Sequence, residues 1–168
     1  HGSSYELPIP PSPNLPNMSA VYLYPTLCLF EGTPISVGRG TDMQFQIVGA
    51  PFLNEGSLTF TPKSMAGAKH PKHEGLECRG FDLSTFGQFY MRNTKKIHLF
   101  WLLNIYQGLD EPSRQEFFTP FFDKLAGTTD LRERIVNGAD EQTIHDSWSE
   151  GIAEFKAVRA KYLLYKDF

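Results

Sequence analysis

The chain has 168 residues, of which 40% are hydrophobic and 21% are charged, so it is long enough for one ordinary domain with a real core. Its net charge of −3 gives no electrostatic basis for binding nucleic acid. The most apolar run, Ile97–Tyr106, is too short to cross a bilayer, so we expect no membrane span.

Prolines dominate the start of the chain. Four of them fall within Pro8–Pro13, and Pro16 follows. Such a stretch favours polyproline-like geometry and lacks backbone donors. We therefore predict that residues 1–19 form a strap or linker leading into a domain of residues 20–168. We also expect the chain to be part of a longer protein.

Residues 20–92 are rich in glycine, proline, threonine and β-forming residues. Their first segment, AVYLYPTLCLF, fits either a strand or a short helix broken at Pro25. Three later segments are predicted strands: MQFQIVGAPF, SLTFTPKS with Leu58 and Phe60 on one face, and GLECRGFDLST between Gly75 and Thr85.

Residues 94–165 are predicted to be helical. Thr94 is expected to cap a helix that runs through Tyr106 and stops at Gly108. A further helix is expected in DLRERIVNG, starting at Thr129 or Asp130 and ending at Gly138.

Asp140 is expected to cap one long amphipathic helix. Its apolar positions are spaced by threes and fours: Ile144, Trp148, Ile152, Phe155, Val158 or Arg159, and Tyr162. We expect this helix to pack with the Ile97–Tyr106 helix under the sheet. Strands first and helices later predict an α+β fold, with a small mixed or antiparallel β-rich N-terminal half packed against a helical C-terminal half.

Several polar residues have simple structural explanations. His70, His73 and Glu74 in HPKHE could donate to a metal, but Pro71 argues against a helix and no zincin spacing or cysteine pair accompanies them. A solvated loop is favoured, so we predict neither a metal nor a cofactor. His98 and His145 lie in helical patterns and are predicted to be interface residues. Cys28 and Cys78 could be buried thiols or one disulfide.

The strongest candidate for a functional site is EGTPISVGRGT. Glu31 can act as an acid, a base or an acceptor for sugar hydroxyls. Arg39 offers a planar fork that suits a carboxylate or phosphate. Glycines and short hydroxyls surround them: Gly32, Gly38, Gly40, Thr33, Ser36 and Thr41. The alternative is a structural connection in which Glu31 and Arg39 pair with each other.

A family resemblance bears on this choice. The quoted stretches PPSPNLPN, YLYPTLCLFEGTPISVGRGTD, FQIVGAPF, FTPKSMAGAKHPKHEGLECRGFDL and FKAVRAKYLLY run in this order along nearly the whole chain. In these stretches the chain closely resembles the C-terminal portion of the NamZ-like exo-β-N-acetylmuramidases, a bacterial glycoside hydrolase family first known as a domain of unknown function. The resemblance implies that a larger N-terminal Rossmann-like domain, with an acidic motif thought to carry catalysis, lies outside these 168 residues.

The resemblance implies an enzyme that removes terminal N-acetylmuramic acid from the non-reducing ends of peptidoglycan fragments. Its cleft would lie between the Rossmann-like domain and this chain, and its location would be periplasmic or secreted. We infer from residue type that Glu31 contributes to catalysis and that Arg39 binds the lactyl carboxylate. The other candidate substrate contacts are Thr33, Ser36, Gly38, Gly40, Thr41 and, from the strap, Asn14. Two alternatives remain open: a binding module without sugar, and a structural accessory domain.

Overall fold

A computed structural model describes residues 5–94 and 96–165 of the chain. Its sheet has three antiparallel strands, β1 (Ile47–Ala50), β2 (Leu58–Phe60) and β3 (Cys78–Asp82), in the order β1-β3-β2. The three strand predictions are confirmed, and the sheet is antiparallel rather than mixed. Leu58 and Phe60 share the half-buried face of β2, whereas all of β1 is buried.

A helix, α1 (Met18–Leu27), opens the half that we predicted to be β-rich. Asn17 caps it by accepting a hydrogen bond from the amide of Ala20. Ala20, Leu23 and Leu27 are buried and lie three and four positions apart, which places them on one helical face. Pro25 lies in the last turn, where it has no N–H to donate to the carbonyl of Val21, and shortly afterwards the chain tightens into a 3₁₀ helix, η1 (Cys28–Gly32).

The remaining elements are all helical. They are α2 (Ser84–Phe86), the π-helical turn η2 (Gly87–Met91), α3 (Arg92–Thr94), α4 (Phe100–Gly108), α5 (Glu111–Gln115), α6 (Pro120–Ala126), α7 (Asp130–Val136), α8 (Glu141–Ser147), α9 (Ser149–Arg159) and the 3₁₀ turn η3 (Ala160–Tyr162). This was predicted for residues 94–165, whereas residues 84–92, which are also helical, lie in the half that was predicted to be β-rich. Together with the small sheet, these helices confirm the α+β class.

The prediction that Thr94 caps a helix running to Tyr106 is wrong. Thr94 ends α3, and α4 begins only at Phe100. The amides ahead of α4 find acceptors on distant elements instead. Thr26 of α1 accepts from the amide of His98 at 2.9 Å, and Glu141 of α8 accepts from the amide of Leu99 at 2.8 Å. The start of this helix is thus set by tertiary contacts.

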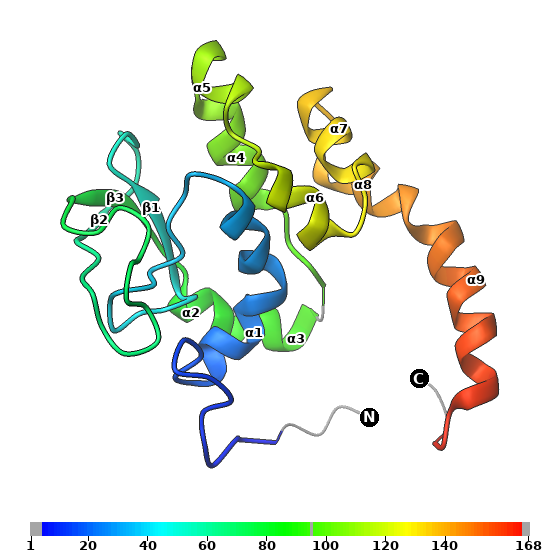
Figure 1. Cartoon of the computed structure of the whole chain (residues 1–168). Coiled ribbons are helices and arrows are strands. Elements are labelled where there is room, and N and C mark those ends of the chain that lie inside the picture. The colour runs from blue at the N-terminus through cyan, green and yellow to red at the C-terminus, as the bar shows by residue number, and fades with distance from the viewer. Residues whose placement is uncertain (1–4, 95, 166–168) are drawn as a thin grey trace.

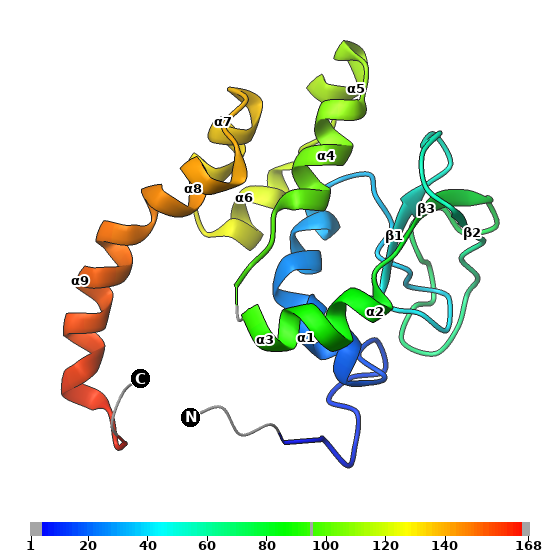
Figure 2. The same cartoon turned by 180° about the vertical axis from the view of Figure 1, so that it is seen from behind.

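The core lies around α1. The views from front and back both show α1 running through the centre, with the sheet on one side, α6 on the other and α4 above the end of α1 (Figures 1 and 2). The largest fully buried side chains include Phe30, Phe117 and Phe122. Residues of α1, β1 and the later helices belong to one hydrophobic core.

The prediction of one long, packed C-terminal helix is only partly correct. Asp140 caps α8 by accepting from the amide of Thr143, as expected, and Ile144 is buried. The helix then breaks at Trp148, which is half-buried against the core. No residue of α9 is buried, so the second half of the predicted stripe does not pack under the sheet.

The structure shows the environment of the two cysteines and of the two histidines in the helical half. Cys28 and Cys78 are both free thiols, so the disulfide alternative does not hold. His98 and His145 face Glu141 at 3.7 Å and 3.8 Å, where α4 begins beside α8, which confirms that they are interface residues. No helix in the described part of the chain is both long and apolar enough to cross a membrane.

Candidate functional site

The loop after η1 is fixed to the edge of the sheet by backbone hydrogen bonds. Ser36 and Gly49 of β1 exchange two bonds of 2.8 Å and 3.0 Å. Gly40 accepts from the amide of Lys63 at 2.8 Å. Gly38 has a φ of +76°, and a Cβ there would lie 2.6 Å from the Cγ1 of Ile47. Glycine is therefore required at this turn.

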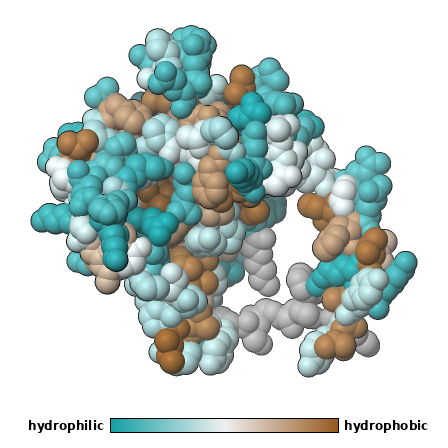
Figure 3. Space-filling model, in the orientation of Figure 1, coloured by the Kyte–Doolittle hydropathy of each residue, from teal (hydrophilic) through white to brown (hydrophobic). Residues whose placement is uncertain are grey.

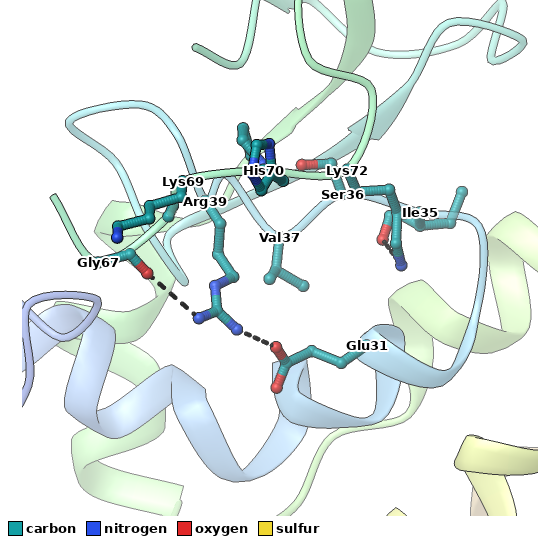
Figure 4. Close-up of a pocket in the computed structure, with 11 residues that line it drawn as sticks. Glu31, Ile35, Ser36, Val37, Arg39, Gly67, Lys69, His70 and Lys72 are labelled. Atoms are coloured by element: carbon teal, nitrogen blue, oxygen red, sulfur yellow. Dashed lines mark hydrogen bonds and ion pairs between the residues drawn. The ribbon is translucent and has the colours of Figure 1, made fainter. Parts of the chain in front are cut away.

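This loop and the segment 67–72 enclose an open pocket of about 560 Å³. Figure 4 shows Arg39 reaching from the loop to Glu31 on η1, with Val37 beside the pair and Lys69 and His70 on the neighbouring segment. The pocket is lined by Glu31, Ile35, Ser36, Val37, Arg39, Gly67, Ala68, Lys69, His70, Pro71 and Lys72. It thus combines one carboxylate with several cationic side chains.

Glu31 and Arg39 form an ion pair in the wall of this pocket. The Nη1 of Arg39 donates to the Oε1 of Glu31 at 2.6 Å, and its Nη2 makes a longer contact of 3.5 Å with the carbonyl of Gly67. The side chains of Arg39 and Glu31 are 39% and 22% exposed. The pair therefore ties the loop down, as the structural alternative predicts, and both side chains remain partly exposed to solvent.

Lys72 is the residue of this site that the sequence analysis missed. Its ammonium group donates to the backbone carbonyls of Phe30, Thr33 and Ile35, at 3.3 Å for Phe30 and 3.0 Å for Ile35. Burial lowers the pKa of Lys72 to about 8, although the nearby Glu31 carboxylate opposes the change. Lys72 thus links the end of η1, at Phe30, to the start of the following loop, at Thr33 and Ile35.

The HPKHE segment is a loop, as predicted, but only part of it is solvated. The His70 side chain is 93% exposed. The Nε2 of His73, in contrast, lies 2.6 Å from the carbonyl of Pro34, to which it can only donate. No sequence signal marked Lys72, and none indicated the partner of His73, because the partners of both residues are backbone carbonyls of a segment far away in the chain.

The predicted short hydroxyls are engaged inside the loop. Thr33 is buried, and its hydroxyl donates to the carbonyl of Phe30 at 2.9 Å. Ser36 is also buried and accepts from the amide of Gly38. Thr41 donates to the carbonyl of Gly38 at 2.7 Å. Of these three residues only Ser36 lines the pocket, so the hydroxyls chiefly shape the loop.

The strap reaches the pocket indirectly. The side-chain amide of Asn14 donates to the carbonyl of Gly67 at 2.9 Å, the same carbonyl that Arg39 approaches. The Oδ1 of Asn14 is buried without a hydrogen-bond partner within the protein. The structure therefore brings Glu31, Arg39 and Ser36 together in the pocket, places Asn14 behind Gly67, and uses Gly38, Gly40, Thr33 and Thr41 as the frame.

The residues described by the structure offer no obvious metal centre. Within 5–94 and 96–165, no group of three or more histidine, cysteine, aspartate or glutamate side chains is placed to hold an ion.

Comparison with known proteins identifies the family. The model for the C-terminal part of the exo-beta-N-acetylmuramidase NamZ matches residues 22–165, which include every residue that lines the pocket. The chain belongs to this family. A curated relative from Bacillus subtilis (strain 168), named peptidoglycan beta-N-acetylmuramidase NamZ, is 34% identical over 170 residues. This match covers 92% of the chain and 40% of the relative.

Solved structures share the fold of the chain. A crystal structure of a DUF1343 family protein from Bacteroides fragilis NCTC 9343 matches with a TM-score of 0.91 and 44% identity, and covers 99% of this chain and 46% of that one. A second DUF1343 family protein from this organism, at 21% identity and a TM-score of 0.58, shares the fold. The chain thus spans less than half the length of each of these proteins and of the curated relative.

Proposed function

We propose that the chain is the C-terminal part of a glycoside hydrolase that releases terminal N-acetylmuramic acid from the non-reducing ends of peptidoglycan fragments. Its pocket would form one wall of the sugar cleft. The observation that carries the proposal is the Glu31–Arg39 pair, which faces an open pocket inside the stretch matched by the NamZ C-terminal model. A peptidoglycan substrate also implies a periplasmic or secreted location.

Glycosidic bond cleavage generally requires two carboxyl groups that flank the scissile bond. Glu31 is the one carboxylate among the described residues that line the pocket. The second carboxyl would come from a Rossmann-like N-terminal domain of the longer protein, which would close over the pocket. Glu31 would then act as the catalytic partner or as an acceptor for a sugar hydroxyl.

Arg39 is proposed to bind the lactyl carboxylate that distinguishes muramic acid from glucosamine. Its Nη1 is occupied by Glu31, whereas its Nη2 makes only the long contact with Gly67. The guanidinium group can therefore keep Glu31 in place and still offer a donor to a bound carboxylate.

A non-catalytic binding or structural accessory role is the second candidate. The observation in its favour is that the loop's own polar groups are largely used within the loop. Thr33 and Thr41 bond to backbone carbonyls, and Lys72 is held by three of them.

The test compares the full-length protein with its Glu31→Gln variant on a chromogenic β-N-acetylmuramide. We expect the variant to lose about 100-fold or more in kcat/KM while its melting temperature changes little. We also expect no turnover by the isolated chain. Unchanged activity of Glu31→Gln would favour the accessory role, and turnover by the isolated chain would contradict the shared cleft.

A further inference from the structure

One face of α9 and the following η3 turn is apolar and exposed to solvent. Ile152, Phe155, Val158 and Tyr162 are 48%, 64%, 53% and 78% exposed. They are spaced by threes and fours, so they form one line along the helix, which we call the apolar stripe. None of them belongs to the hydrophobic core or packs against it.

The apolar spacing of the stripe begins before α9. In the same spacing, Ile144 of α8 is fully buried, and Trp148, at the break between α8 and α9, packs partly against the core. Figure 1 shows α9 leaving the body of the protein where α8 ends, and Figure 3 shows brown apolar patches on this separate arm. The apolar residues before the break are therefore covered, and those after it are left open.

An exposed stripe of this kind indicates a missing partner. Glu150 lies on the side of α9 away from the stripe, and Glu154 and Lys156 flank it, so the helix has the amphipathic pattern of one that packs on a surface. In water, an isolated helix of about 12 residues is only marginally stable without tertiary packing. Contiguous exposed apolar surface usually marks an interaction site.

The length of the relatives points to the occupant. The match to the Bacteroides fragilis structure covers 99% of this chain, so it extends through α9, yet it accounts for only 46% of that protein. The Bacillus subtilis relative is likewise covered over only 40% of its length. In both relatives, more than half of the polypeptide lies outside the region that this chain represents.

We propose that the apolar stripe is the docking surface for the N-terminal part of the full-length protein, which would present an apolar groove to it. The contact would hold the two parts of the polypeptide together at a place separate from the Glu31 pocket. This docking contact does not depend on which reaction the protein catalyses. An experiment can therefore disprove the contact without disproving the proposed hydrolase activity, and the reverse.

Hydrogen–deuterium exchange tests the proposal without a substrate. The amides of α9 are expected to exchange at least about 100-fold more slowly in the full-length protein than in the isolated chain. The amides of α4, whose buried face is packed in the chain itself, serve as the internal control and should differ little. Equal exchange of α9 in both proteins would overturn the proposal.

A pair of variants identifies the responsible face. Phe155→Asp places a charge in the apolar stripe, and Ala157→Asp places the same charge toward the polar side of α9. In the full-length protein, Phe155→Asp should raise α9 exchange to the rate of the isolated chain and lower the melting temperature by several degrees, whereas Ala157→Asp should do neither. Similar effects of the two variants would contradict the assignment.

The isolated chain distinguishes the other possible occupants. If its α9 amides become protected as the protein concentration rises, and Phe155→Asp abolishes this protection, the stripe binds a second copy and the proposal is wrong. Binding of the isolated chain to phosphatidylglycerol vesicles through Phe155, without α9 protection in the full-length protein, would likewise replace the docking role by a membrane contact.

Discussion

The substitution Arg39→Lys separates the two functions that the structure gives to this guanidinium group. Arg39 bonds Glu31 through Nη1 at 2.6 Å and lies 3.5 Å from the carbonyl of Gly67 through Nη2. A lysine at this position keeps the positive charge beside Glu31. It loses the planar fork, so one ammonium group can no longer satisfy Glu31 and grip a substrate carboxylate through two parallel bonds.

The expected magnitudes differ for the fold and for the substrate. The Arg39 side chain is 39% exposed, so the ion pair is screened by solvent, and the variant should lose less than about 1 kcal/mol in the free energy of unfolding. A charge-assisted contact with the lactyl carboxylate is worth about 1.5–3 kcal/mol. Its loss corresponds to a decrease of about 10-fold to 100-fold in kcat/KM.

The assay measures kcat/KM of the full-length protein and its Arg39→Lys variant on a chromogenic β-N-acetylmuramide. The control substrate is the corresponding N-acetylglucosaminide, which lacks the lactyl group. Any rate on that substrate should hardly change. If the variant unfolds, or if both sugars are affected equally, Arg39 is a structural tie to Glu31 and does not recognise the lactyl group.

Three further predictions concern stability. The pKa of Lys72 is lowered from 10.5 to about 8, so between these pH values the unfolded chain binds more protons than the folded chain. The free energy of unfolding should therefore rise with pH across this window, by at most about 3 kcal/mol. Urea titrations at several pH values should show this rise for the original chain and not for Lys72→Met. Gly32→Ala would place a Cβ 2.5 Å from the Cα of Phe122. It should cost about 3 kcal/mol, whereas Gly151→Ala, which has open space around it, should cost nothing. Trp148→Ala should cost about 2 kcal/mol because the ring is half-buried, and a loss below about 0.5 kcal/mol would contradict its packing on the core.

The pocket itself could be predicted only in part. The loop of Glu31 and Arg39 was recognisable, because it gathers a carboxylate, a guanidinium group and short hydroxyls on a glycine-rich backbone, but this composition suits a structural connection equally well. That the two side chains pair and still face an open pocket was not predictable, since this depends on the segment 67–72 that forms the other wall. The alternatives of substrate site and structural tie were thus both reasonable readings of the same residues.

The sequence by itself determined the α+β class, the positions of the three strands and the cap at Asp140. These features depend on local preferences: alternation along a strand, a side-chain oxygen bonding an amide three residues on, and glycine at a left-handed turn. Only the tertiary structure decided where α4 begins, why the apolar stripe stays uncovered beyond Trp148, and why Lys72 is buried. The carbonyls that hold the Lys72 ammonium group come from residues 37 to 42 positions earlier in the chain, and no local pattern can encode a contact whose partners meet only when the loop folds against the sheet.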